Sequence, residues 1–80
     1  MDIMENHVYR AKKPQPVDLD GSPVYNDRSV LWVSSRHVQY DSPHIQAGRF
    51  PRVRREQFEK WAGEDVTEGY PEGWAEWTIR

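Results

Sequence analysis

Most apolar residues of this chain are β-branched or aromatic, and this feature restricts the fold more than any other. The sequence contains eight valines, three isoleucines, four tryptophans, four tyrosines and two phenylalanines, but only two leucines. β-Branched and aromatic side chains suit the half-buried surface of a sheet, whereas leucine is a stronger helix former. We therefore predict an α+β fold that is mainly β, with three to five short strands and one short helix. An SH3-like barrel is one arrangement of such strands.

The length suits a single small domain, which we place over residues 1–80. A chain of 80 residues buries only about 60% of its unfolded surface, and this one has no cysteine to support its core with disulfides. The lack of cysteine also suits a reducing compartment. The first residues lack the basic start and apolar run of a signal peptide, and no segment approaches the ~18 apolar residues of a membrane helix. We expect a cytoplasmic protein that does not bind membranes.

Strand and turn signals recur along the first two thirds of the chain. We expect a short strand within residues 1–11 and further strands near 24–25, 30–34, 36–40 and 49–53. Pro51 has no N–H to donate, so the last of these should lie at an edge of the sheet. Residues 12–16 form a basic, proline-spaced connector, and Asp20-Gly21 is the strongest turn signal in the sequence.

A short helix is predicted over residues 55–62. Three apolar residues at positions i, i+3 and i+4 form one stripe: Phe58, Trp61 and Ala62. Gly63 is placed to end this helix. The N-terminus is poorly made, because two arginines occupy the first turn, where the helix dipole prefers acids, and no capping side chain precedes them.

Residues 64–80 form an acidic tail that contains three large aromatic residues. Tyr70, Trp74 and Trp77 either close over the core or remain exposed as a patch that grips a partner. Closure is favoured, because a short domain that left them out would lose much of its available burial. Trp74 and Trp77 are nevertheless candidate binding residues. Trp32 and Trp61 lie in regular strand and helix patterns, so we predict that both belong to the core.

Four of the eleven basic residues lie within residues 49–55, which we call the basic segment. Its candidate binding residues are Arg49, Phe50, Arg52, Arg54 and Arg55. Arginine can hold a phosphate or a carboxylate in a two-pronged contact, and an aromatic ring can stack on a base. The segment would therefore suit either an acidic protein surface or a nucleic acid. Alternatively, Phe50 and Val53 pack in the core and the arginines form a solvated face beside Glu56, Glu59 or the acidic tail.

Part of this region resembles a known family. Residues 47–53, Ala-Gly-Arg-Phe-Pro-Arg-Val, are followed at 56–61 by Glu-Gln-Phe-Glu-Lys-Trp. The stretch is similar to the one after the recognition helix in small winged-helix regulators of the excisionase and AlpA type. The resemblance implies an upstream helix-turn-helix that binds DNA, with helices over residues 34–40 and 42–47.

No arrangement of residues predicts catalysis, a metal site or a cofactor. The three histidines are widely spaced and no cysteine accompanies them, and a net charge of −2 selects neither nucleic acid nor an acidic membrane. We expect a small non-enzymatic binding protein, such as an accessory or regulatory factor of a phage or mobile element, that engages a protein partner through the basic segment. The alternative is a nucleic-acid-binding regulator of the winged-helix type. The sequence does not indicate an oligomeric state.

Overall fold

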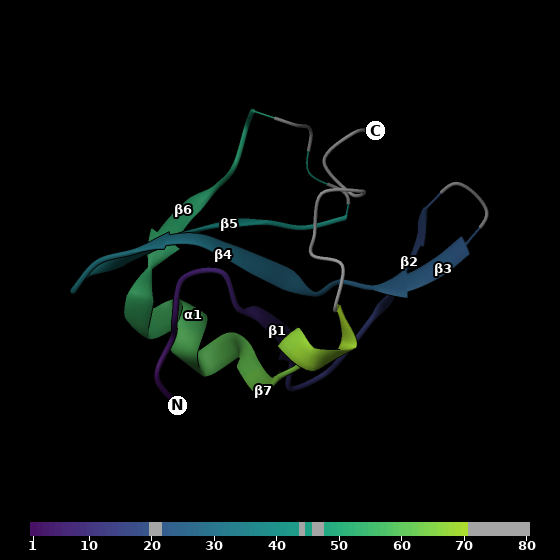
Figure 1. Ribbon diagram of the computed structural model, residues 1–80, viewed down its shortest axis with the longest axis horizontal. Coiled ribbons are helices and arrows are strands. Elements are labelled where there is room, and N and C mark those ends of the chain that lie inside the picture. The colour runs from purple at the N-terminus through teal and green to yellow at the C-terminus, as the bar shows by residue number, and fades with distance from the viewer. Residues whose placement is uncertain (20–21, 44, 46–47, 71–80) are drawn as a thin grey trace.

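The computed structural model describes residues 1–19, 22–43, 45 and 48–70 (Figure 1). These residues form seven strands, one α-helix and one short 3₁₀ helix. In chain order the elements are β1 (Val8–Ala11), β2 (Pro16–Leu19), β3 (Ser22–Tyr25), β4 (Arg28–Val33), β5 (His37–Asp41), β6 (Arg52–Arg54), α1 (Arg55–Trp61), β7 (Ala62–Asp65) and η1 (Thr67–Gly69).

Five of the strands form one antiparallel sheet in the order β6-β5-β4-β1-β7. The chain runs through β4, β5 and β6 as a meander, crosses one face of the sheet as α1, and returns as β7 to pair with β1 (Figure 1). The mainly-β α+β fold with one short helix is confirmed. Strands β6 and β7 are not paired within the described residues, so this part of the chain forms a five-stranded sheet with β6 and β7 at its edges.

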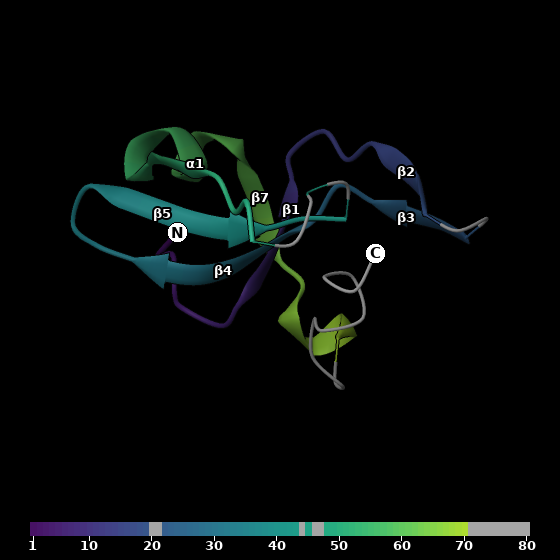
Figure 2. The ribbon, with the colours of Figure 1, turned by 90° about the horizontal axis from the view of Figure 1, so that it is seen from above.

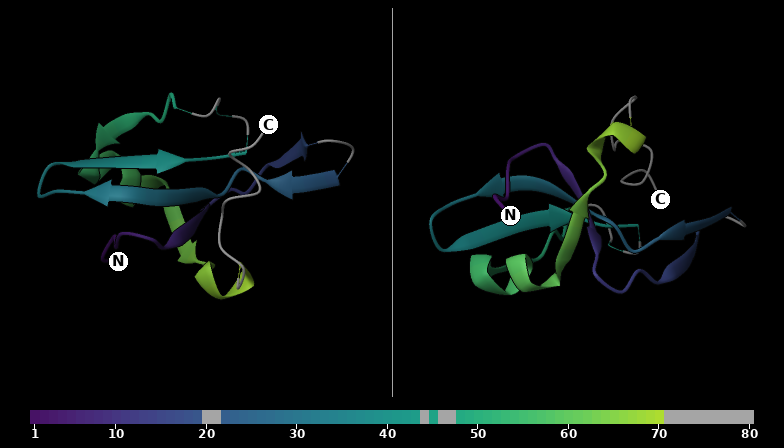
Figure 3. Two further views of the ribbon diagram at one scale, coloured as in Figure 1. Left: turned by 45° about the horizontal axis from the view of Figure 1, so that its top comes forward. Right: turned by 90° about the horizontal axis from the view of Figure 1, so that it is seen from below.

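Strands β2 and β3 form a separate antiparallel hairpin that projects away from the main sheet (Figure 3). Its register pairs Pro16 with Tyr25 and Leu19 with Ser22. The proline-spaced connector expected over residues 12–16 ends at the start of this hairpin, because Pro16 is the first residue of β2. The Asp20-Gly21 turn signal lies outside the described residues.

The core lies between the sheet and α1. Phe58 of α1 is fully buried, and its ring lies 5.8 Å from Tyr9, 5.7 Å from Tyr40 and 5.2 Å from Trp61, measured between ring centroids. Because side chains alternate along a strand, the sheet contributes every second residue to this layer. Phe58 and Trp61 of the predicted stripe therefore lie on the side of α1 that faces the sheet, with Trp61 packed against the core. The third residue of the stripe, Ala62, is buried as the first residue of β7.

A β-bulge in β4 decides which residues of this strand enter the core. Val30 pairs with Tyr40 but Trp32 pairs with Gln39, so Leu31 is an extra residue in β4. In a regular strand, Val30 and Val33 would face opposite sides, whereas the bulge brings both to the core side and turns Trp32 outward. Trp32 is 38% exposed, so the prediction that it belongs to the core was wrong.

Helix α1 begins where it was predicted but ends for a different reason. Arg54 is the N-cap and makes no capping side-chain hydrogen bond, as the sequence indicated. The chain passes straight from Trp61 into β7, and Gly63 lies within that strand. A Cβ on Gly63 would lie 2.8 Å from the Lys12 Cα, so glycine is needed there for close pairing with β1 and not to end the helix.

The helix-turn-helix implied by the excisionase-like resemblance is not formed. Residues 34–40 make a turn and most of β5, where that architecture requires a helix. The strand pairs with β4 and β6 and contributes the buried Val38 to the core. The winged-helix interpretation was therefore wrong as a description of the fold. In the part of the chain that the structure describes, no helix is long and apolar enough to cross a membrane.

Candidate functional site

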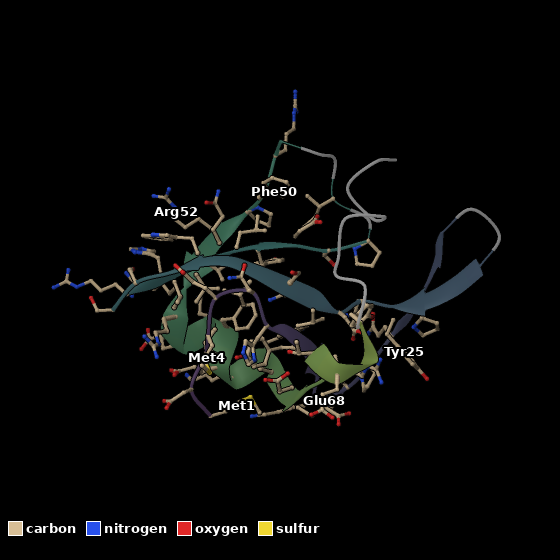
Figure 4. All side chains as sticks on the ribbon, in the orientation of Figure 1. Met1, Met4, Tyr25, Phe50, Arg52 and Glu68 are labelled. Carbon is tan, nitrogen blue, oxygen red and sulfur yellow. The ribbon has the colours of Figure 1, made fainter. Side chains whose placement is uncertain are left out.

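The face of the sheet opposite α1, which we call the outer face, carries the residues that alternate with the core. The register places Trp32, Gln39 and Arg52 in one row across β4, β5 and β6, and His37 beside Arg54 in the next outer row. In Figure 4, Arg52 lies above the sheet whereas α1 lies below it. We call these five residues the open patch.

Trp32 and Arg52 form the centre of the open patch. The Cζ atom of Arg52 lies 5.3 Å from the centroid of the Trp32 ring, within the range of a cation–π contact. Gln39, between them in the row, donates a hydrogen bond from Nε2 to the Phe50 carbonyl at 3.1 Å and so ties the loop before β6 to the sheet. Arg52 is exposed and makes no hydrogen bond or ion pair with any described residue. Tryptophan and arginine are both enriched among the residues that contribute most to binding in known protein interfaces.

The structure divides the arginines of the basic segment between different surroundings. Arg52 and Arg54 share the outer face, and Arg49 is exposed in the preceding loop. Arg54 Nη1 lies 3.7 Å from Glu56 Oε1, and both side chains are largely exposed. Arg55 is half-buried, and its Nη1 donates to the Ser34 carbonyl at 3.2 Å.

One arginine of the basic segment, Arg55, forms an ion pair within α1. Arg55 Nε lies 3.6 Å from Glu59 Oε2, one helical turn away. Exposed pairs of this kind contribute about 0–1 kcal/mol. The solvated-face interpretation therefore applies to Arg54 and Arg55 in part, since each has a nearby glutamate. Arg52 has none among the described residues.

A groove of about 540 Å³ continues from the open patch toward the start of α1. The turn between β4 and β5 forms one side, where the Arg55 N–H donates to the Arg36 carbonyl at 2.7 Å. Arg36 is distant from the basic segment in sequence, and sequence reasoning missed it because only the fold brings the turn to α1. The groove is lined by Ser35, Arg36, His37, Arg54, Arg55, Glu56 and Glu59.

The remaining candidate residues lie elsewhere. Phe50 is half-buried, between the two states that the sequence left open (Figure 4). Trp74 and Trp77 lie outside the described residues. Tyr70, the first aromatic residue of the tail, is turned inward and donates its hydroxyl to Asp27 Oδ2 at 2.5 Å. The described start of the tail therefore closes onto the domain, and η1 lies on the opposite side of the strands from α1 (Figure 2).

Another part of the outer face is occupied by a polar cluster centred on Asp27, which we call the Asp27 cluster. The Asp27 side chain is fully buried and receives Arg10 Nε at 3.0 Å on Oδ1 and Arg10 Nη2 at 3.1 Å on Oδ2. Ser42 Oγ donates to the Asp27 carbonyl at 3.0 Å.

The hydrogen bonds to Asp27 raise the pKa of Arg10. Burial raises the pKa of Tyr70, and its hydrogen bond to Asp27 acts in the same direction. The Asp27 cluster is internally satisfied and stabilises the fold.

Comparison with protein-family models, with curated proteins and with solved structures finds no match. Among the residues that the structure describes, no group of three or more histidine, aspartate or glutamate side chains could hold a metal ion. The geometry of the open patch is therefore the observation from which a function can be argued.

Proposed function

We propose that this protein is a small, non-enzymatic binding module that engages an acidic region of a protein partner through the open patch, in an accessory or regulatory role. The observation that carries the proposal is the exposed Trp32 with Arg52 over its ring, on the part of the outer face that the Asp27 cluster does not occupy. Tryptophan and arginine are the residues most often found at the energetic centre of protein interfaces. A chain without cysteine suits a cytoplasmic location.

The charges around Trp32 favour an acidic partner. Arg52 and Arg54 extend from neighbouring outer positions of β6, and Arg36 lies at the adjoining groove. The chain as a whole has a net charge of −2, so the attraction would be local to this face. Glu56 and Glu59 line the groove beside Arg54 and Arg55 and interrupt the basic surface there. A protein partner is favoured over nucleic acid, because spaced acidic side chains can meet single arginines, whereas a continuous phosphate backbone would also meet these glutamates.

The proposal is tested by selecting a displayed library of random peptides against the wild-type protein. We expect enrichment of peptides rich in aspartate and glutamate. Their affinity should fall at least ~10-fold for Trp32→Ala and for Arg52→Glu, because both substitutions remove a residue at the centre of the patch. Lys60→Ala is the matched control, since it removes an exposed basic residue from α1, away from the outer face.

Two results would contradict the proposal. The first is a selection that enriches no acidic peptide, or one whose peptides bind all the variants equally. The second is tight binding of labelled single-stranded or duplex DNA that weakens steeply with salt and is lost in Arg52→Glu, which would assign the same patch to nucleic acid. Circular dichroism of each variant establishes that the fold is retained.

A further inference from the structure

The free edge of β6 adjoins the open patch and presents unpaired backbone groups. Residues of an antiparallel edge strand alternate between those that bond to the neighbouring strand and those whose N–H and C=O point away from it. The Tyr40 N–H donates to the Pro51 carbonyl at 3.2 Å, and the Arg55 N–H donates to the Arg36 carbonyl at 2.7 Å. Positions 51, 53 and 55 therefore face β5, whereas the backbone of Arg52 and Arg54 points away from the sheet.

Three backbone groups remain available on this edge. The carbonyl of Arg54, as the N-cap residue, accepts the first hydrogen bond of α1. The N–H and C=O of Arg52 and the N–H of Arg54 have no partner among the described residues. This pattern of a donor, an acceptor and a second donor suits the backbone of an extended peptide.

The side chains of the same residues determine which peptide fits. A strand added beside β6 would continue the outer face, so its outer side chains would lie next to Arg52 and Arg54. Two arginine-bearing edges repel each other, which disfavours pairing of β6 with β6 of a second copy. The same charges attract a strand with aspartate or glutamate at every second position.

We infer that the acidic partner binds as an extended strand added to the free edge of β6, with its acidic side chains on the outer face over Arg52 and Arg54. This inference rests on the proposed function and adds the conformation and charge pattern of the bound segment. Backbone hydrogen bonds to Arg52 and Arg54 supply the register, and the arginine side chains and Trp32 supply the selectivity.

The test uses a short, capped peptide in which glutamate and valine alternate, with binding measured by calorimetry to the full chain. Arg54→Ala and Arg54→Pro both remove the arginine side chain, but only proline also removes the outward N–H. Arg54 has φ −67° and follows a strand residue, so proline fits there, and its N–H makes no bond to β5 that would be lost. We expect Arg54→Pro to bind the peptide at least ~10-fold more weakly than Arg54→Ala.

A second measurement needs no protein variant. In a strand, alternate residues direct their N–H groups to opposite edges. Two versions of the peptide therefore carry N-methyl groups on one or the other alternate set of residues. We expect the version methylated on the edge that pairs with β6 to lose binding to the wild-type protein, and the other version to retain it. In the complex, the amides of Arg52 and Arg54 should exchange with solvent more slowly than in the free protein.

Equal affinities of Arg54→Pro and Arg54→Ala, or retained binding by both methylated peptides, would overturn strand addition. So would a failure of the alternating peptide to bind wild-type protein that still binds acidic peptides from the displayed library. In each case the proposed function stands if Arg52→Glu still abolishes binding of the selected peptides. If Arg54→Pro does not fold, the methylated peptides decide the question.

Discussion

The Asp27 cluster and the open patch place arginine beside an aromatic ring in two different ways. Arg10 lies 4.4 Å from the Tyr25 ring centroid and holds both oxygens of the buried Asp27. Arg52 lies 5.3 Å from the Trp32 ring centroid and has no carboxylate partner among the described residues. The residue types are similar, but the buried carboxylate makes one arginine part of the fold, whereas the other arginine is exposed and has no such carboxylate among the described residues.

The difference has an energetic cause. A charge removed from water must be paired and hydrogen-bonded, and removing one partner of such a pair costs far more than removing an exposed charge. Substitutions in the Asp27 cluster should therefore lower the stability of the fold, whereas substitutions in the open patch should lower the affinity for a partner. We expect the largest effect on stability at Asp27 and the smallest at Arg52.

Asp27→Ala should destabilise the protein by about 3–5 kcal/mol, because it leaves the Arg10 guanidinium partly buried without its counter-charge. Urea unfolding monitored by circular dichroism measures the loss. Affinity for acidic peptides should be unchanged under conditions where the variant is folded. A loss below ~1 kcal/mol is what an exposed ion pair gives, so it would contradict the view that the pair between Asp27 and Arg10 stabilises the fold as a buried pair.

Tyr70→Phe should cost about 1.5–3 kcal/mol, since it removes a hydrogen bond to a charged group. The raised pKa of Tyr70 adds a test in alkali. The folded pKa lies above the unfolded value of about 10, so this contribution is fully present below pH ~10 and is lost as the pH rises through the folded pKa. The phenylalanine variant should lack this alkaline loss, and a wild type with the same alkaline profile as the variant would contradict the assignment.

Acid should loosen the end of β7 through Asp65. Burial alone would raise the pKa of Asp65, but hydrogen bonds from Thr67 and His7 outweigh it and hold the pKa below its ordinary value. The stabilisation is therefore present above pH ~4 and is lost as the pH falls through the folded pKa. Unfolding measured between neutral pH and pH ~3 should show this loss in the wild type and a smaller one in Asp65→Asn. If the wild type and Asp65→Asn lost the same stability in acid, the loss would come from other carboxylates and not from Asp65.

Arg52→Ala should have the smallest effect on stability, within about 0.5 kcal/mol, because the side chain is exposed and unpaired among the described residues. Its affinity for selected acidic peptides should nevertheless fall clearly. A destabilisation comparable to that of Asp27→Ala would mean that Arg52 supports the fold, and the distinction between the two regions would disappear.

Local patterns in the sequence were sufficient for much of the fold. Phe58 and Trp61 follow the helical period that the sequence shows, and an edge strand was expected beside Pro51, because a proline is disfavoured in a central strand. The poor cap at Arg54 was also evident from residue type alone. These features depend on neighbours within a few positions, which is why the sequence reveals them.

Features that depend on pairing between distant segments were not predictable. The outward position of Trp32 depends on a bulge, and a one-residue change of register reverses the face of every following side chain. No local pattern marks Asp27 as the centre of a cluster, because its partner Arg10 comes from another strand. Arg36 joined the candidate site only through the packing of a turn against α1.

The position of β1 between β4 and β7 has a consequence for biosynthesis. Residues 8–11 leave the ribosome before either of their neighbours in the sheet, which begin at residue 28 and at residue 62. Until β7 is available, β1 has an unpaired edge, and such an edge can pair with other chains. The nascent protein therefore completes this sheet only when β7 emerges, and a chain interrupted before β7 keeps an edge that can pair with other chains.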